Sequence, residues 1–533
     1  RFHVGSLAKS VLATGVLRLA TEGRIDIDAP IMNYLPGLVL MNLWMGSTDV
    51  TVRHLLDHTS GLNDAQLWHI FSERADPDAP LIAAFPDPGS QLKVRSRPGS
   101  RFSYSNIGYT LLGMIIEVVV GDRYETYLDE FVLAPLAMYD STFAFTTQQG
   151  ESADTTLAWG HVDGGHRYAA SPTFLRPAGQ FTTTTSDLAR FAEFLLGDGV
   201  VDGRPFIDEV LMRSRGQPFA TEAASQGLIA GYALGLGRRD RHGVVGYCHA
   251  GNIVGFVSML CIFPDEHKAF AYSVNTDSET ADYGRLDSLF IEALNVAKSP
   301  LPPTGDSADD ISEWYGRYVL RPNRFQMFEY LDTVFGAIQV SADEDALTLR
   351  SLQRDARRLR PVGDYLYAAN DRSTTSHVFY RGPDGEYLLG DGFQTFEKLP
   401  AVYLFAHWIS ILLGLTGLVW VLLFGAVSLV RHRSGMLRRP ESPAFIASVL
   451  LFVPVPFFFA QSFMSLGDVT PASVLLAAVT LLLPLGMLLS ILLTRKKWQT
   501  SWTSWLHLLA AVFVLQWCVV LAASGMLPLM LWT

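Results

Sequence analysis

The last quarter of this chain carries four apolar stretches that are each long enough to cross a lipid bilayer. They cover approximately residues 402–430, 444–466, 472–493 and 505–523. A transmembrane helix needs about 20 mostly apolar residues to span a hydrocarbon core about 30 Å thick. Proline falls inside two of the stretches, and membrane helices tolerate it where neighbours satisfy the freed carbonyls. The simplest prediction is a transmembrane domain of four helices over residues 401–533.

Basic residues predict which side of the membrane each connecting loop faces. They gather in the first and third loops, at Arg431, Arg433, Arg438, Arg439, Arg495, Lys496 and Lys497. The second loop, residues 467–471, has Asp468 as its one charge. By the positive-inside rule, loops one and three are cytoplasmic. The rest of the chain is then expected on the periplasmic or extracellular side of a bacterial inner or plasma membrane.

Composition agrees with this division. The 533 residues are 49% hydrophobic and their mean hydropathy is +0.21, which is too apolar for a purely soluble protein of this size. The net charge of -11 argues against nucleic acid as a partner. The basic clusters lie beside the spans, where membrane lipid is the expected partner.

Near the other end of the chain, Ser6 and Lys9 stand three positions apart, which places both side chains on one face of a helix. A serine hydroxyl becomes a strong nucleophile when a base takes its proton. A lysine can be that base where burial or a neighbouring cation lowers its pKa. This spacing recurs by chance in long chains, so further motifs must support it.

Two such motifs follow. Tyr104 lies just before an apolar run that begins at Asn106 and is typical of a buried helix. A phenol near a lysine ammonium can ionise more easily and can shuttle a proton. His249 and Gly251 come at the end of a strand-like stretch, residues 244–248, and a second one covers 256–263. Glycine at such an edge allows close backbone approach and lets an N–H group face an oxyanion.

These motifs, with the run His58-Thr59-Ser60-Gly61-Leu62, resemble the serine β-lactamase and penicillin-binding-protein superfamily, in its class C-like branch of esterases, D-amino-acid peptidases and β-lactamases. The resemblance covers residues 1–295. It implies an α/β (α+β) penicillin-recognising serine hydrolase fold, with an antiparallel sheet flanked by helices, in a domain over residues 1–297. That fold places two strands and a helix before the nucleophile, so the N-terminus is expected to be truncated.

The resemblance also implies a role for each motif residue. Ser6 is the acylated nucleophile, Lys9 its base and Tyr104 the general acid and base. Substrate and oxyanion contacts fall to Asn106, His249, Gly251 and Asn252, with the backbone N–H groups of Ser6 and Asn252 forming the oxyanion hole. No cofactor and no metal are implied. His54 and His58 are four positions apart, with Asp57 between them, a spacing that could suggest a metal site. A zinc site of this kind needs a third ligand, and none is evident in the sequence.

His249 departs from the β-lactamase pattern, which usually has lysine at this position. A permanent cation helps to hold the carboxylate of a β-lactam, whereas histidine, with an unperturbed pKa of about 6.5, is mostly neutral at pH 7. A peptidase or esterase is therefore favoured over a β-lactamase.

Between the two ends of the chain, turn-forming residues over 298–310 predict a linker. Residues 311–400 alternate polar and apolar in short runs, which predicts a small antiparallel barrel or sheet. The opening Trp314-Tyr315-Gly316-Arg317-Tyr318 resembles lipocalin-like accessory domains. We expect this domain to serve in packing or as a lid rather than to bind a ligand.

The three cysteines are expected to form no disulfide. A tight turn at residues 252–254 would place Cys248 opposite a residue near 257, out of reach of Cys261, and Cys518 lies in the last span.

The function that these features predict is a membrane-anchored serine hydrolase that cleaves an amide or ester of a small molecule or peptide through an acyl-enzyme. A penicillin-recognising sensor or a β-lactamase is one alternative. A regulatory outer domain on a membrane complex is a second alternative. Two short inner loops and the lack of a cytoplasmic domain weigh against the sensor.

Overall fold

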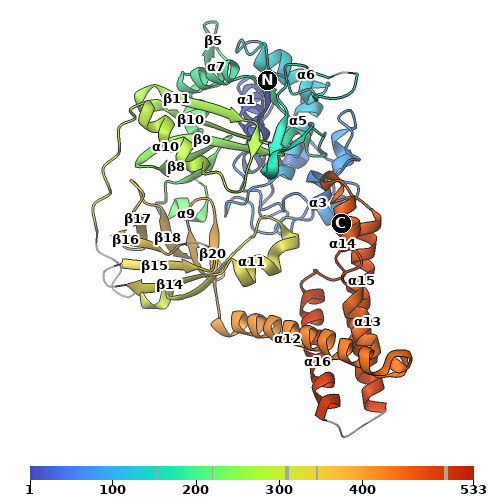
Figure 1. Cartoon of the computed structure of the whole chain (residues 1–533). Helices are drawn as coiled ribbons and strands as arrows, with labels where there is room; N and C mark the ends of the chain where they lie inside the picture. Colours follow the sequence, from blue (N-terminus) through green and yellow to red (C-terminus); the bar gives the residue numbers. More distant parts are fainter. Residues whose placement is uncertain (152, 219, 306–310, 344–345, 354, 497–501) are drawn as a thin grey trace. The chain divides into compact units, whose positions relative to one another are not determined.

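The computed structural model describes the chain except for residues 152, 219, 306–310, 344–345, 354 and 497–501. The chain separates into two compact units (Figure 1). Unit 1 comprises residues 1–65, 75–324 and 338–398, and unit 2 comprises 66–74, 325–337 and 399–533. The last five positions of the expected linker, and Lys497 of the third loop, lie outside the described residues.

An antiparallel five-stranded sheet forms the centre of the first domain in unit 1, with strand order β11-β10-β9-β8-β7. The strands are β7 Gly231–Ala233, β8 Leu236–Arg241, β9 Val244–Ile253, β10 Phe256–Phe263 and β11 Lys268–Val274. Helix α1 (Ala8–Thr21) packs at the β7–β8 turn, where Ser10 Oγ donates to the carbonyl of Gly235 at 2.7 Å. Helix α10 (Tyr283–Ala293) covers an apolar cluster on the sheet through Ile291. The expected antiparallel sheet flanked by helices is confirmed.

Further helices of this domain are α2 Val52–Leu56, α5 Asn106–Val120, α6 Tyr124–Leu128 and α7 Thr185–Leu196. The apolar run after Tyr104 forms α5, as predicted. Ser105 caps it by accepting the N–H of Gly108 at 3.0 Å, and Gly121 ends it with a φ of 79° that favours glycine. Because Tyr104 immediately precedes the cap, its position is tied to the start of a buried helix.

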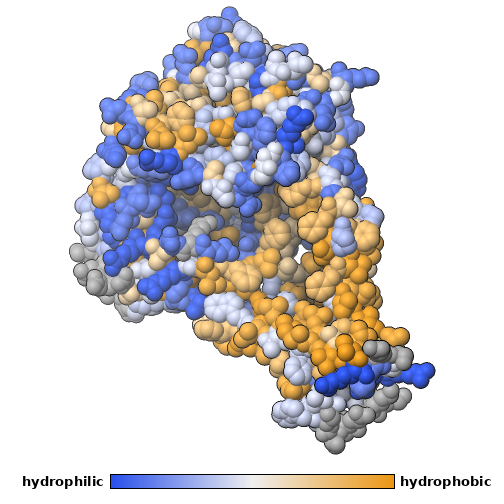
Figure 2. All heavy atoms as spheres, viewed as in Figure 1, coloured by the Kyte–Doolittle hydropathy of each residue, from blue (hydrophilic) through white to orange (hydrophobic). Residues whose placement is uncertain are grey.

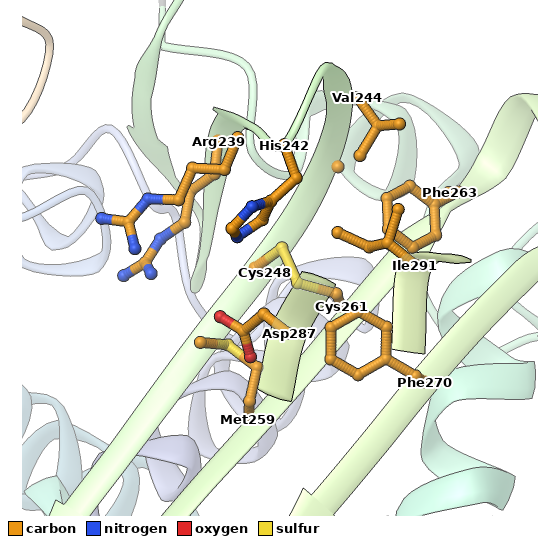
Figure 3. Close-up of a pocket in the computed structure, with 12 residues that line it drawn as sticks. Arg239, His242, Val244, Cys248, Met259, Cys261, Phe263, Phe270, Asp287 and Ile291 are labelled. Carbon is orange, nitrogen blue, oxygen red and sulfur yellow. A yellow bond between two sulfur atoms is a disulfide. The ribbon is translucent and has the colours of Figure 1, made fainter. Parts of the chain in front are cut away.

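The prediction that Cys248 and Cys261 remain unpaired is wrong. They form a disulfide across β9 and β10, with their Cα atoms 4.1 Å apart (Figure 3). The hairpin turns at residues 254–255, two positions later than expected, so Ile253 pairs with Phe256 and Cys248 falls directly opposite Cys261. A small error in the position of the turn therefore changed every cross-strand partner.

Residues after the linker form a closed barrel, as the alternating pattern predicted. Its strands, in order around the barrel, are β13 Gly316–Leu320, β14 Ile338–Asp343, β15 Ala346–Ser351, β16 Arg357–Gly363, β17 Leu366–Ala369, β18 His377–Arg381, β19 Tyr387–Gly390 and β20 Thr395–Leu399. Trp314, Tyr318 and Phe379 belong to the apolar cluster inside it. The barrel packs on the first domain within unit 1, for example through Ala223 against Val378 and Leu388.

Unit 2 holds four candidate membrane spans among the described residues, at Ala401–His432, Ser442–Ala460, Pro471–Arg495 and Trp502–Ala523. They correspond to α12 Ala401–His432, α13 Ser442–Leu450 with α14 Val455–Ala460, α15 Pro471–Lys496 and α16 Trp502–Ala523. Apolar residues dominate their surface (Figure 2). Small residues allow close packing: a Cβ on Gly417 would lie 2.6 Å from the carbonyl oxygen of Ala510.

Two short segments from earlier in the chain also belong to unit 2. The first, residues 66–74, contains α3 (Leu67–Ile70), and the second, residues 325–337, contains α11 (Glu329–Phe335). Asp468 binds the first segment: it accepts the backbone N–H of Glu73 at 2.9 Å and pairs with Arg74 at 2.7 Å. Unit 2 is therefore built from three stretches of chain, and two of them interrupt unit 1.

Candidate active site

Ser6 and Lys9 meet at the start of α1. Ser6 lies in the 3-10 turn Gly5–Leu7 that leads into the helix, rather than in the helix itself. Nζ of Lys9 is 3.0 Å from Oγ of Ser6 and donates to the carbonyl of Ala178 at 2.5 Å. The Lys9 side chain is fully buried, and this desolvation lowers its pKa well below the usual value of a lysine. The amine is thereby suited to take a proton from Ser6.

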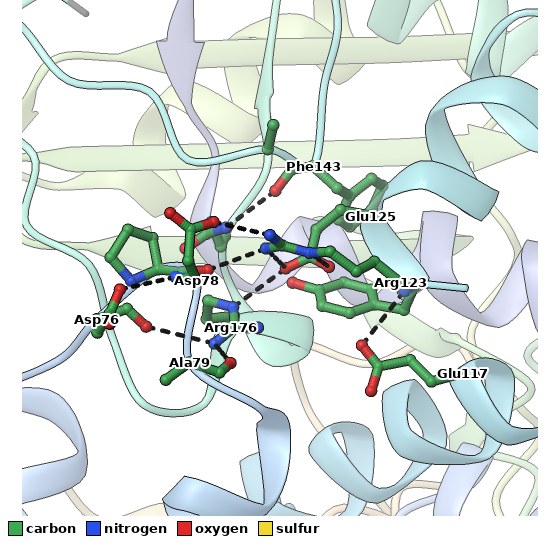
Figure 4. Close-up of polar contacts among 12 residues, drawn as sticks. Asp76, Asp78, Ala79, Glu117, Arg123, Glu125, Phe143 and Arg176 are labelled. Atoms are coloured by element: carbon green, nitrogen blue, oxygen red, sulfur yellow. Dashed lines mark hydrogen bonds and ion pairs between the residues drawn. The ribbon is translucent and has the colours of Figure 1, made fainter. Parts of the chain in front are cut away.

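The carbonyl that Lys9 contacts is itself held by a buried ion pair. Ala178 ends the 3-10 turn Arg176–Ala178, and Arg176 pairs with the buried Glu125 at 3.1 Å (Figure 4). Arg176 also donates to the carbonyl of Ala79 at 2.8 Å. Arg123 pairs with Glu125 from the other side at 3.3 Å. This network fixes the turn that faces the lysine.

The backbone before Ser6 lies directly against the third motif. A Cβ on Gly251 would be 1.8 Å from the carbonyl oxygen of Val4, and one on Gly5 would be 2.6 Å from that of Asn252. Gly5 also has a φ of +52°. Glycine is therefore required at both positions. The close approach places Gly5, the residue before Ser6, against the backbone of Asn252.

Tyr104 stands beside the same pair. Lys9 Nζ is 4.9 Å from the centre of its ring, and the ring of His58 stacks on it at 4.1 Å. Contrary to the expectation of easier ionisation, burial raises the pKa of Tyr104 to about 12, although Arg324 and a hydrogen bond with Ser6 lower it. Tyr104 therefore keeps its proton near neutral pH and is suited to donate it.

His249 lies within β9 rather than at the end of a strand. Its Nδ1 is 2.7 Å from the carbonyl oxygen of Ala250, and its Nε2 is buried with no hydrogen-bond partner among the described residues. Desolvation, followed by the charge of Lys9, lowers the pKa of His249 to about 3. The imidazole is neutral at physiological pH, so this position carries no positive charge.

Asn106 is held by a carboxylate that the sequence motifs did not single out. Asp64, whose side chain is fully buried, accepts the Asn106 backbone N–H at 2.6 Å and contacts its Nδ2 at 3.3 Å. Arg324, from the barrel domain, pairs with Asp64 at 2.6 Å. Asp64 lies two residues after the His-Thr-Ser-Gly-Leu run, and this position could have marked it as a site residue. Nothing in the local sequence around Arg324 indicated a role.

The histidines near this run make local contacts. His54 Nδ1 accepts the backbone N–H of Thr51 at 3.2 Å, and His58 Nδ1 accepts that of Ser105 at 3.1 Å. Burial lowers the pKa of both side chains. Across the described residues, no group of three or more His, Cys, Asp or Glu side chains is arranged to hold a metal ion.

Comparison with known proteins identifies the family. The family described as "Beta-lactamase" matches residues 1–293, more than half of the chain. Penicillin-binding protein 4 of Amycolatopsis lactamdurans is 27% identical over 329 residues, which cover 60% of this chain and 84% of that protein. Penicillin-binding protein 4* of Bacillus subtilis is 26% identical over 348 residues, which cover 60% and 72%.

Solved structures are also similar. SurE with D-Leu aligns with a TM-score of 0.48 and 24% identity, over 75% of this chain and 87% of that one. D-amino acid amidase from Ochrobactrum anthropi SV3, complexed with D-phenylalanine, aligns with a TM-score of 0.44 and 24% identity, over 55% and 92%. By the match of residues 1–293, the chain belongs to the beta-lactamase family and is a serine hydrolase.

Proposed function

We propose that the protein cleaves an amide or ester bond by acyl transfer to Ser6, at the outer face of a bacterial inner or plasma membrane. The observation that carries this proposal is the 3.0 Å contact between Oγ of Ser6 and Nζ of the buried Lys9. A neutral amine at that distance accepts the serine proton as the oxygen attacks a carbonyl.

The first half of the reaction forms the acyl-enzyme. The Ser6 oxygen bonds to the carbonyl carbon, its proton passes to Lys9, and the carbonyl oxygen becomes an oxyanion held by the N–H groups of Ser6 and Asn252. Tyr104 gives its proton to the leaving group as the carbon–nitrogen or carbon–oxygen bond breaks, and it recovers a proton from Lys9. Asn106 and Gly251 contact the substrate beside the reacting bond.

In the second half, water attacks the acyl carbon and restores the enzyme. The water gives one proton to Lys9, which is neutral again after passing its proton to Tyr104, the bond to Ser6 breaks, and that proton returns to the serine oxygen. His249 stays neutral throughout, which favours a substrate without an obligatory carboxylate at that position. This favours a peptidase of the D-amino-acid type or an esterase over a β-lactamase.

Three observations support an outer location for the active site. Disulfides such as Cys248–Cys261 persist in oxidising compartments. The basic residues flank the first and third loops between spans. Residues 66–74, joined at both ends to unit 1, are bonded to Asp468 in the second loop, which supports the proposal that this loop and the catalytic residues share one side of the membrane.

The full chain in detergent and its Ser6→Ala variant test this proposal. The control is Ser288→Ala, at a serine of α10 whose hydroxyl donates to the backbone carbonyl of Arg285. Each is incubated with an activated ester, a D-amino-acid amide and a fluorescent penicillin, and intact mass and turnover are measured. We expect turnover of ester or amide that requires Ser6 and is unchanged in the control. A lasting penicillin adduct without turnover would favour a penicillin-recognising sensor; the two relatives are named for penicillin binding. No reaction that depends on Ser6 would refute the proposal.

A further inference from the structure

A side chain of the barrel domain, Arg324, reaches the active site. Arg324 follows β13 in the chain, and its Nε donates to Asp64 at 2.6 Å. Its guanidinium carbon lies 4.5 Å from the centre of the Tyr104 ring. A residue that is 260 positions away from Asp64 in sequence thus contacts two parts of the constellation around Ser6.

Asp64 transmits this contact to Asn106. One carboxylate oxygen accepts the Asn106 backbone N–H, while the other contacts both Asn106 Nδ2 and Arg324 Nε. A fully buried carboxylate is costly unless it is paired with a cation. Arg324 supplies that charge, and Asp64 in turn fixes which way the Asn106 amide points.

The backbone beside Arg324 is clamped to the first domain. Arg95 donates to the carbonyl oxygen of Asn323 at 2.7 Å and to its Oδ1 at 2.6 Å. Asn323 is fully buried. Arg324, the next residue, is therefore held near the site by the hydrogen bonds of Asn323 to Arg95.

A second ion pair across the same domain boundary has no such connection. Arg101 of the first domain pairs at 3.3 Å with Glu386 of the barrel and at 3.3 Å with Glu222. Among the described residues, Glu386 bonds to Arg101 and to the backbone N–H groups of Gly382 and Asp384, and to none of the residues around Ser6. This pair provides a matched control for effects that arise only from holding the two domains together.

We propose that Arg324 is a positioning residue for the acyl-transfer reaction, which orients Asn106 through Asp64 and places its positive charge against the phenol ring of Tyr104. The barrel domain is then part of the working enzyme rather than a packing or lid domain. This inference rests on the proposed function.

The charge of Arg324 also reaches Lys9. Desolvation is the main cause of the lowered pKa of Lys9; Asp64 acts against it and Arg324 adds to it. Loss of Arg324 alone leaves Asp64 to raise the pKa of Lys9, so less neutral amine is present at a given pH. Other titratable or charged groups among the described residues that interact with Lys9 or Tyr104 are His58, His249, Tyr109, Tyr232 and Arg239.

The test compares Arg324→Gln, Arg324→Lys and Glu386→Gln with the wild-type full chain, using Ser6-dependent ester or amide turnover over a range of pH. For Arg324→Gln we expect kcat/KM to fall by about tenfold to hundredfold, chiefly through kcat. The reason is that Asn106 and Tyr104 would no longer be held in the geometry that the reaction needs. The acid limb of the pH profile should move to higher pH. Arg324→Lys keeps the charge, so the acid limb of its pH profile should stay where it is in the wild type. Glu386→Gln should match the wild type in both kcat/KM and pH profile.

Arg324→Gln leaves a buried carboxylate without its cation and can fail to fold. The double variant Asp64→Asn/Arg324→Gln removes both charges, so its acid limb should lie near that of the wild type while its kcat stays low. The proposal would be overturned if a folded Arg324→Gln, or the double variant, kept the kcat and pH profile of the wild type. It would also be overturned if Glu386→Gln lost as much kcat as Arg324→Gln. Absence of Ser6-dependent turnover in the wild type would instead refute the proposed function.

Discussion

At the scale of single residues, the site depends on the Lys9 amine, whose pKa burial lowers well below the usual value of a lysine. Replacing Lys9 with methionine should lower kcat/KM by about 10²–10⁴-fold, the usual contribution of a general base. In the wild type, activity should rise as pH increases through the lowered pKa of Lys9, because the neutral form is the base. The pH dependence of kcat/KM measures this. Lys268→Met removes a half-buried lysine that is paired with Glu266, and it should change neither the kcat/KM nor its pH dependence.

The same lowered pKa affects stability. The folded protein binds fewer protons at Lys9 than the unfolded chain does, so folding becomes more favourable as pH rises between the lowered pKa and about 10.4. The Lys9→Met variant should lose that part of the pH dependence. The measurement is the difference in melting temperature between this variant and the wild type at several pH values. A difference that does not change with pH would contradict this explanation.

His249 offers a test of substrate preference. With its pKa near 3, the imidazole carries no charge that could hold a carboxylate. His249→Lys should raise penicillin acylation relative to ester turnover by about tenfold, the value of one additional charge-assisted hydrogen bond. The ratio of the two rates is the measurement, and His267→Lys, on an exposed turn, is the control. An unchanged ratio in a folded His249→Lys would mean that this position does not select the substrate.

At the scale of elements, the β9–β10 hairpin is fastened by Cys248–Cys261, which lies next to His249. Without reductant, the unfolded protein should react with a maleimide at Cys518 alone, and after reduction at all three cysteines. Replacing both paired cysteines with alanine should destabilise the protein by about 2–3 kcal/mol, the typical value for a loop of this length. Three reactive thiols without reductant would contradict the pairing.

Local chemistry made the helices, the barrel and the motif residues predictable. Each rests on short-range spacing: Ser6 and Lys9 on one face, or Asn106 at the head of an apolar run. The disulfide was missed because its register depends on a turn whose position the pattern did not fix. The Asp64–Arg324 pair was missed because it joins residues that only the packing of two domains brings together.

At the scale of the whole molecule, unit 2 depends on Asp468 to hold residues 66–74. Asp468→Ala removes the acceptor for Ser72, for the Glu73 N–H and for Arg74. Because buried donors left without partners are costly, the melting temperature in detergent should fall by several degrees. Asp371→Ala, which breaks an exposed ion pair with Arg357, should leave it unchanged. Equal melting temperatures for both variants would mean that this contact does not stabilise the protein.

The interleaving of the two units also bears on whether the enzyme can be shed. A protease that cut the chain at residues 399–400 would separate the barrel from the first span. Residues 66–74 and 325–337 would still be packed within unit 2 and still be joined to unit 1 by peptide bonds. A single cut at this point therefore leaves unit 1 attached to unit 2 through these two segments.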